Sequence, residues 1–122
     1  MSIIYRRHET YPNHILIRYF IEKVSVAQII KSWKYLLENK MINPQIKGVI
    51  NNLEGCKLEM DMEGFKTLMN FLSSKKELHG IKLAVVCDCP ENIVFPMRGE
   101  FEQNQLQIKP FTLMESAVKW II

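Results

Sequence analysis

Two cysteines that follow an apolar run are the residues of this chain best suited to chemistry. Cys87 and Cys89 come directly after residues 81–86, which have the pattern of a buried strand. Backbone amides at a helix start lower a thiol pKa and can cradle an oxyanion. Such a cradle needs a short glycine-bearing loop closed by an arginine, whereas residues 88–92 are acidic and glycine-free, and Arg98 is distant. We therefore expect inert thiols, and a thiol enzyme at Cys87 or Cys89 stays open as an alternative.

The residues that commonly bind metals and phosphates are scattered. His8 and His14 could face each other across a turn, but His79 stands far along the chain, and the two neighbouring cysteines are spaced Cys-x-Cys rather than Cys-x-x-Cys. We interpret the first two histidines as surface side chains. The five glycines form no phosphate-binding loop, and no serine stands in a nucleophile elbow. The sequence thus predicts no metal, no cofactor and no enzymatic activity.

Acidic side chains gather in two segments that each follow a predicted strand. One segment surrounds the start of the second predicted helix, where negative charge is favourable beside exposed amides, so helix capping explains part of it. Loops at the carboxyl ends of parallel strands are also where open α/β sheets usually place function. We therefore predict that these loops bind a protein partner. The residues concerned are Glu54, Glu59, Asp61, Glu63, Asp88 and Glu91.

Length and composition are typical of one globular domain. The chain has 122 residues, of which 48% are hydrophobic, so residues 1–122 are expected to form a single domain. The formal net charge is +3, and the basic excess lies in residues 1–50. Its basic side chains either alternate with apolar residues or fall on the polar side of a helix, and no recognition motif accompanies them. We expect no nucleic-acid partner.

The compartment is predicted from what the sequence lacks. Its apolar stretches are far shorter than the roughly 20 residues of a membrane helix, and the first residues do not resemble a signal peptide. Three cysteines cannot all pair internally, which fits reduced thiols. We expect a cytoplasmic protein that does not bind membranes.

The first half of the chain predicts a hairpin followed by a helix. Residues 2–9 and 14–21 are β-rich runs joined by a turn, and Arg18 is the one charge on the second, largely covered strand. Ser25 followed by Gln28 is a capping box, which predicts that a helix begins at Val26.

The second half alternates strands and helices. We expect strands at 48–53 and 81–86, a helix capped by Asp61, and a broken helix within 88–104. An edge strand ends near Pro110, and Thr112 with Glu115 predicts a second capping box. The order β-β-α-β-α-β-α-β-α predicts one mixed, mostly parallel sheet of about five strands with helices on both faces.

This element order, with the runs KGVINNL at 47–53, IKLAVV at 81–86 and FTLMESAVKW at 111–120, resembles the STAS domain family. More narrowly it resembles the SpoIIAA-like proteins, bacterial relatives of anti-sigma-factor antagonists. The resemblance implies a SpoIIAA-like α/β fold and a non-enzymatic, regulatory protein-binding module. In such antagonists a phosphorylatable serine stands at the start of the second helix, whereas residues 59–64 contain no serine or threonine. A phosphorylation switch is therefore not expected.

Two further predictions concern partners. The same general fold resembles the lipid-binding CRAL-TRIO domain, so a small-ligand or lipid-binding protein is an alternative, not favoured because so short a chain has little room for a cavity. The apolar ending Trp120-Ile121-Ile122 suggests a homodimer.

Overall fold

The computed structural model of the chain describes residues 3–88, 96 and 106–122. Its main sheet has the strand order β1-β2-β4-β6-β7, in which β1 is antiparallel to β2 and the other neighbours are parallel. This confirms the α/β class and the mixed, mostly parallel sheet. The strands are β1 (Ile3–Arg7), β2 (Ile15–Phe20), β4 (Gly48–Asn52), β6 (Lys82–Val86) and β7 (Gln107–Phe111).

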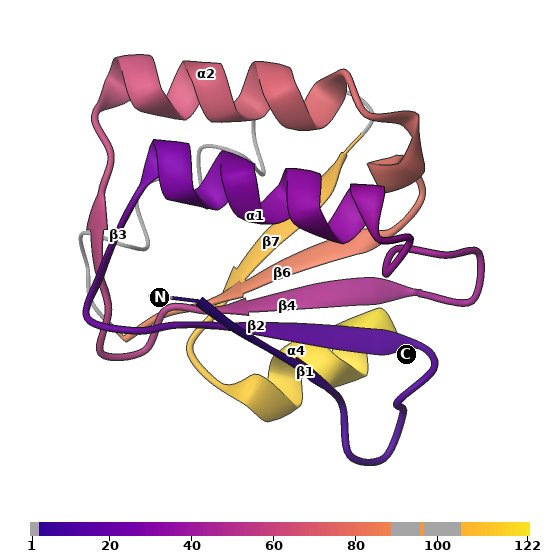
Figure 1. Cartoon of the computed structure of the whole chain (residues 1–122). Helices are drawn as coiled ribbons and strands as arrows, with labels where there is room; N and C mark the ends of the chain where they lie inside the picture. The colour runs from indigo at the N-terminus through magenta and orange to yellow at the C-terminus, as the bar shows by residue number, and fades with distance from the viewer. Residues whose placement is uncertain (1–2, 89–95, 97–105) are drawn as a thin grey trace.

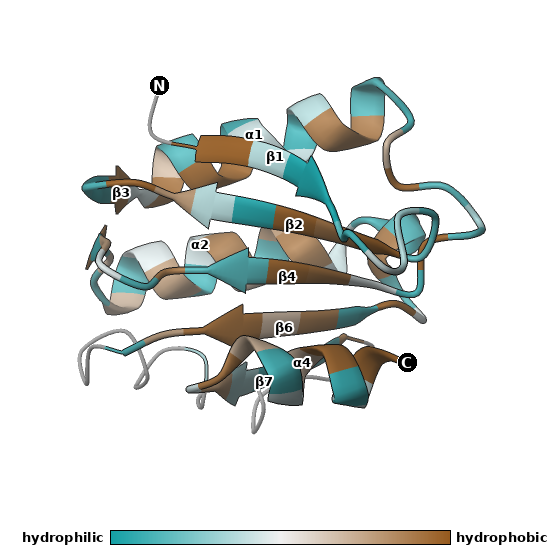
Figure 2. Cartoon of the chain, turned by 90° about the horizontal axis from the view of Figure 1, so that it is seen from below, coloured by the Kyte–Doolittle hydropathy of each residue, from teal (hydrophilic) through white to brown (hydrophobic). Residues whose placement is uncertain are grey.

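Helices cover both faces of this sheet, as the sequence predicts. The helices α1 (Val26–Glu38) and α2 (Met62–Ser73) lie on one face, and a short 3-10 helix, η1 (Lys76–Leu78), follows α2 (Figure 1). The last helix, α4 (Met114–Ile121), lies on the other face (Figures 1 and 2). Among the helices described, none has the length and apolar character needed to cross a membrane.

One of the two predicted capping boxes is present. Ser25 Oγ accepts a hydrogen bond from the Gln28 backbone N–H, and the Gln28 side chain accepts one from the Ser25 backbone. The second prediction is wrong: α4 starts after Leu113, which makes no side-chain capping bond. If Thr112 were the N-cap, the helix would begin at Leu113, but α4 begins one residue later. Its first turns are stabilised by apolar contact with the sheet instead of by a side-chain cap.

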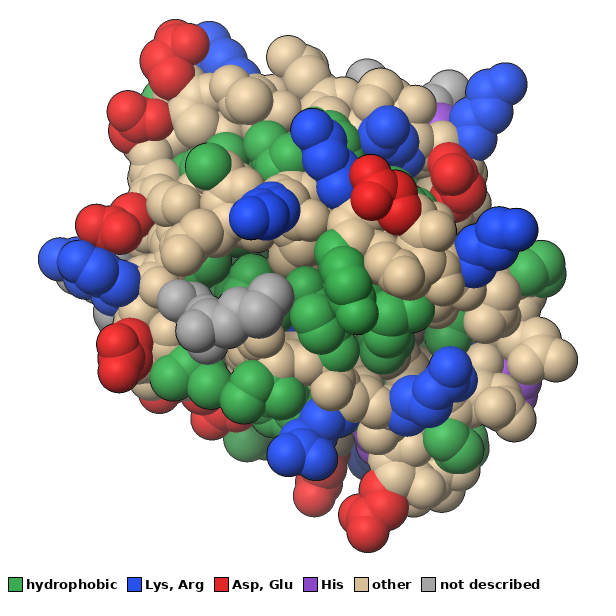
Figure 3. Space-filling view, in the orientation of Figure 1, with side chains coloured by type: hydrophobic (Ala, Val, Ile, Leu, Met, Phe, Trp, Pro, Cys, Tyr) green, Lys and Arg blue, Asp and Glu red, His purple; other side chains and the backbone are tan. Residues whose placement is uncertain are grey.

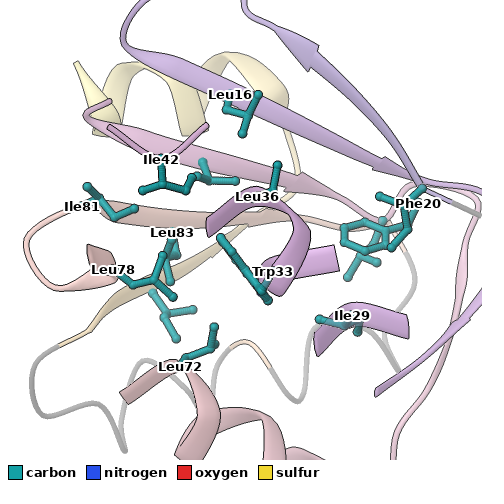
Figure 4. Close-up of a cluster of buried hydrophobic side chains, with 14 of the residues drawn as sticks. Leu16, Phe20, Ile29, Trp33, Leu36, Ile42, Leu72, Leu78, Ile81 and Leu83 are labelled. Atoms are coloured by element: carbon teal, nitrogen blue, oxygen red, sulfur yellow. The ribbon is translucent and has the colours of Figure 1, made fainter. Parts of the chain in front are cut away.

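Two layers of apolar side chains hold the fold together. The larger layer lies between the sheet and α1 with α2, where Trp33, Leu36 and Leu72 pack against strand residues (Figure 4). The smaller layer joins the opposite face of the sheet to α4. There Gly48 lies so close to Ile121 that a β-carbon on the glycine would stand 2.7 Å from the Ile121 Cγ2 atom. The close approach explains a glycine inside a strand.

A second, two-stranded sheet was not predicted. It pairs β3 (Lys23–Ser25) with β5 (Lys57–Glu59), immediately before α1 and shortly before α2. Three-residue strands are too short for an alternating pattern to identify them. The pairing fixes the starts of α1 and α2 beside each other. The helix predicted within 88–104 falls on a segment that lies almost wholly outside the described residues.

The apolar C-terminal end folds mostly inward. Ile121 is buried in the smaller layer, and Trp120 packs against Phe111 with a ring-centroid distance of 5.6 Å. Ile122 remains 48% exposed. Most of the apolar surface that suggested a homodimer is therefore packed against other residues of the same chain. Self-association stays a prediction.

Candidate functional site

The predicted partner-binding loops lie at one end of the sheet. Strands β2, β4 and β6 finish at the end where α1 and α2 begin (Figure 1). Glu54 follows β4 and Asp88 follows β6, and both are exposed. The Gly55 backbone N–H donates to Asp88 Oδ1 at 3.3 Å, which joins the two loops. The structure therefore brings together residues separated by more than thirty positions in the sequence.

The other described acids lie around the start of α2. Glu59 ends β5, Asp61 is the N-cap of α2, and Glu63 is in its first turn; all three are exposed. Asp61 Oδ1 accepts a hydrogen bond from the Gly64 backbone N–H at 2.8 Å, so this carboxylate does cap the helix. Acidic side chains project along this edge of the molecule, on the left in Figure 3. Glu91 lies outside the described residues.

A surface depression of about 350 Å³ adjoins this acidic end. Its wall includes Ile4 and Ile21, each 40% exposed, two acids, Glu22 and Glu54, and one base, Arg6. Glu22 has a φ of 64°, the left-handed region that non-glycine residues adopt at a cost. The sequence did not predict that these two isoleucines are exposed. Their β-rich segments have the pattern of strands whose apolar side chains are covered.

The described cysteines do not offer a reactive thiol. Cys87 is completely buried, and its backbone N–H donates to the Phe111 carbonyl at 3.0 Å. Cys56 is also buried, and burial raises the pKa of its thiol, which lowers the fraction of nucleophilic thiolate. Cys89 lies outside the described residues.

His8 and His14 make local hydrogen bonds at the hairpin. The His8 Nδ1 atom accepts from the backbone N–H groups of Thr10 and Tyr11, both at 3.1 Å, which holds the turn. The His14 Nδ1 atom lies 2.9 Å from the Gln45 carbonyl. Within residues 3–88, 96 and 106–122, no three histidine, cysteine or acidic side chains are grouped so that they could hold a metal ion.

The most unusual side chain of the interior is Arg18, the lone charge expected on β2. It is 2% exposed, and its Nε and Nη2 atoms both donate to Asn51 Oδ1, at 2.8 and 2.5 Å. Its Nη1 atom donates to Ser32 Oγ at 3.0 Å, and this oxygen also accepts from the Tyr5 hydroxyl at 2.7 Å. Asn51 is itself oriented by a bond from its Nδ2 to the Ala84 carbonyl. Among the described residues, the acceptors bonded to this cation, Asn51 and Ser32, are neutral.

Aromatic rings supply the rest of the environment of Arg18. Its Cζ atom lies 4.0 Å from the centroid of Trp33 and 4.9 Å from that of Phe20. Such cation–π contacts favour the charged form. Burial acts in the opposite direction and lowers the pKa of Arg18 to about 9, so the guanidinium still carries its charge at neutral pH. The sequence pattern predicted a lone charge on β2. It did not predict the residues that contact this charge, because most of them belong to other strands and helices.

Arg18 also lines a cavity between the helices and the sheet. The cavity has a free volume of about 80 Å³, and its described walls come from α1, α2, β2, β4, β5, β6 and β7, with Leu53, Met60 and Pro96. Apart from Arg18 and Asn51, the described lining side chains are apolar. Figure 3 shows green, hydrophobic side chains in the recess between α2 at the top and α1 below it.

Comparisons with known proteins identify the fold. No protein-family model matches the chain, and no curated protein matches it. Among solved structures, the chain is similar to an uncharacterised DUF3478-family protein with a SpoIIAA-like fold from Shewanella loihica, with a TM-score of 0.64 and 15% sequence identity. The match covers 99% of this chain and 93% of that one. The chain thus has a SpoIIAA-like fold, as the resemblance implied.

Proposed function

We propose that this chain is a non-catalytic protein-interaction module that binds its partner at the acidic end of the sheet. The observation that carries the proposal is the convergence of two loops, linked through Gly55 and Asp88, beside a depression with exposed isoleucines. Exposed apolar side chains rimmed by charges are typical of protein-binding surfaces. The acids around it favour a partner whose contact face is basic.

The chain lacks a phosphorylatable residue at the start of α2, and this bears on how the proposed binding is regulated. The start of α2 carries Asp61 and Glu63 where the related antagonists have a phosphorylatable residue. Their charge is permanent, so the proposed binding is not switched by a kinase acting at this position.

Cross-linking from one side chain tests the location of the surface. A photoreactive benzoylphenylalanine replaces Ile21 in the depression and, as the control, Tyr35, which is 47% exposed on α1. We expect one protein of defined mass to be cross-linked from position 21 and not from position 35. Equal labelling from both positions, or no labelled protein from position 21, would contradict the proposal.

A charge-reversal pair tests the chemistry of the same surface. Glu54→Lys is compared with Glu38→Lys, the same substitution at an exposed position in the last turn of α1. Like-charge contact with a basic partner costs a few kcal/mol, so E54K should lower the affinity for the cross-linked partner by roughly tenfold or more, with E38K unchanged. Equal affinities for the two variants would refute the electrostatic part of the proposal.

A further inference from the structure

The depression at the acidic end of the sheet carries opposite charges at its two ends. In the register of β1 with β2, Arg6 lies opposite Ile17 and Ile4 lies opposite Tyr19. Side chains two positions apart on a strand share one face of the sheet, so Arg6 and Ile4 point to the same side. Along the direction of β2, the exposed side chains of the wall form a row in the order Arg6, Ile4, Ile21 and then Glu22 with Glu54.

The face that carries this row is open beside α4. On this side of the sheet α4 contacts β4, β6 and β7. Figure 2 views the same face and shows the start of β1 and the end of β2 uncovered by α4. It also shows that β1 changes from hydrophobic at its start to hydrophilic at its end. A second protein surface can therefore reach both the isoleucines and the charges.

The row is complementary to itself when it is reversed. A two-fold axis between two copies, running across their strands, places Arg6 of one copy opposite the two acids of the other, and Ile4 opposite Ile21. Each of these contacts then occurs twice. A partner whose contact face were basic throughout would repel Arg6. The acids need a base opposite them and Arg6 needs an acid, and a second copy supplies both.

We propose that the partner bound at the acidic end is a second copy of this chain, with Arg6 of each copy facing Glu22 and Glu54 of the other. This inference rests on the proposed function and names the partner of the same surface. The isoleucines stabilise the dimer, and the charges fix its orientation, because exposed ion pairs add little affinity whereas like charges in contact are costly. The contact lies away from residues 120–122, whose apolar surface is mostly packed within the chain.

Sedimentation velocity of the full chain over a concentration series measures the dimer. We expect a species with twice the mass of one chain. Arg6→Glu and Glu54→Lys should each raise its dissociation constant about tenfold or more, because each places like charges in contact twice. Arg7→Glu is the matched control, since Arg7 is also exposed but points to the other face of the sheet, and it should leave the dimer unchanged. A chain that stays monomeric up to millimolar concentration would overturn the proposal.

Mixing the two weakened variants tests the orientation. In a dimer of one R6E chain with one E54K chain, the new acid at position 6 faces the new base at position 54, and the second contact keeps the original Arg6 and Glu54. The mixture should therefore form a heterodimer with nearly the affinity of wild type. Both side chains are exposed, so both variants are expected to fold. A mixture that associates as weakly as either variant alone would refute the reversed arrangement and with it the proposed dimer.

The cross-link from position 21 separates this proposal from the proposed function. In an extract of cells that express the benzoylphenylalanine variant, we expect a covalent dimer whose linked peptide contains Ile4. A product with a different protein and no covalent dimer would keep the interaction surface and exclude a second copy as its partner. No product from position 21 would remove both proposals.

Discussion

Replacing Arg18 and Asn51 singly and together would measure how the core holds a buried charge. The three variants are Arg18→Met, Asn51→Leu and the double variant, each of which substitutes an apolar side chain of similar size. In the folded chain the two residues share two hydrogen bonds to one oxygen, Asn51 Oδ1. Both are nearly inaccessible, at 2% and 7% exposure, so water cannot replace a lost partner.

The expected magnitudes differ between the two single variants. Asn51→Leu leaves a buried guanidinium without its main acceptor, which should lower the free energy of unfolding by about 3–5 kcal/mol. Arg18→Met leaves a neutral amide oxygen unpaired and should cost about 1–3 kcal/mol. Additivity would give about 4–8 kcal/mol for the double variant. We expect instead a cost of about 1 kcal/mol or less, because neither polar group is left behind.

Urea unfolding followed by circular dichroism is the assay. With a slope of about 1–3 kcal/mol per molar urea, the loss expected for Asn51→Leu moves the midpoint by roughly 2 M, and the double variant should return close to the wild-type midpoint. A double variant as unstable as the sum of the single variants would refute the reasoning. The two side chains would then act separately, and the hydrogen bonds between them would not be the source of the stability.

Three further predictions concern the same fold. Because burial lowers the pKa of Arg18 to about 9, from 12.5 for the unperturbed group, the unfolded chain retains this proton longer than the folded one does. The stability of wild type relative to Arg18→Met should therefore increase by about 1 kcal/mol between pH 7 and pH 10. Urea midpoints measured at both pH values test this, and an unchanged difference would contradict a lowered pKa of Arg18. Gly48→Ala should cost about 1–3 kcal/mol because its β-carbon meets the Ile121 side chain. The same substitution should cost less in an Ile121→Ala background, which removes all three of the side-chain atoms that the β-carbon meets; equal costs in the two backgrounds would exclude the clash. Asp61→Ala should lower the free energy of unfolding by about 1 kcal/mol, measured by thermal unfolding, because α2 loses its N-cap. Asp61→Asn keeps the acceptor and should lower it much less. Equal losses of stability in the two variants would exclude capping as the cause.

Much of the fold could be predicted because its patterns are local. The alternation in β2 and the capping box at Ser25 each need fewer than ten residues to be recognised, and both are confirmed. The capping box at Thr112 has the same sequence form but does not exist, because a capping box also requires the helix to start at that residue. The start of α4 is set by contact with the sheet, which no local pattern reports.

The candidate sites were predictable only in part, since they join residues that are distant in sequence. The acidic loops could be located because each follows a strand, and parallel strands end together. The link between Gly55 and Asp88 spans 33 positions, as does the contact of Arg18 with Asn51. An asparagine near the end of β4 has many possible roles, and only the strand register places it beside the arginine of β2.

The stability measurements on Arg18 and Asn51 decide whether folding requires the charge in the core. Replacing a buried charge and its partner by apolar groups is often neutral or stabilising, so retention of such a pair is weak evidence for a role in folding. If the double variant of Arg18 and Asn51 is as stable as wild type, folding does not require the guanidinium. If the double variant is much less stable, the contacts of the guanidinium with the rings of Trp33 and Phe20 stabilise the core, and Arg18 is a structural residue.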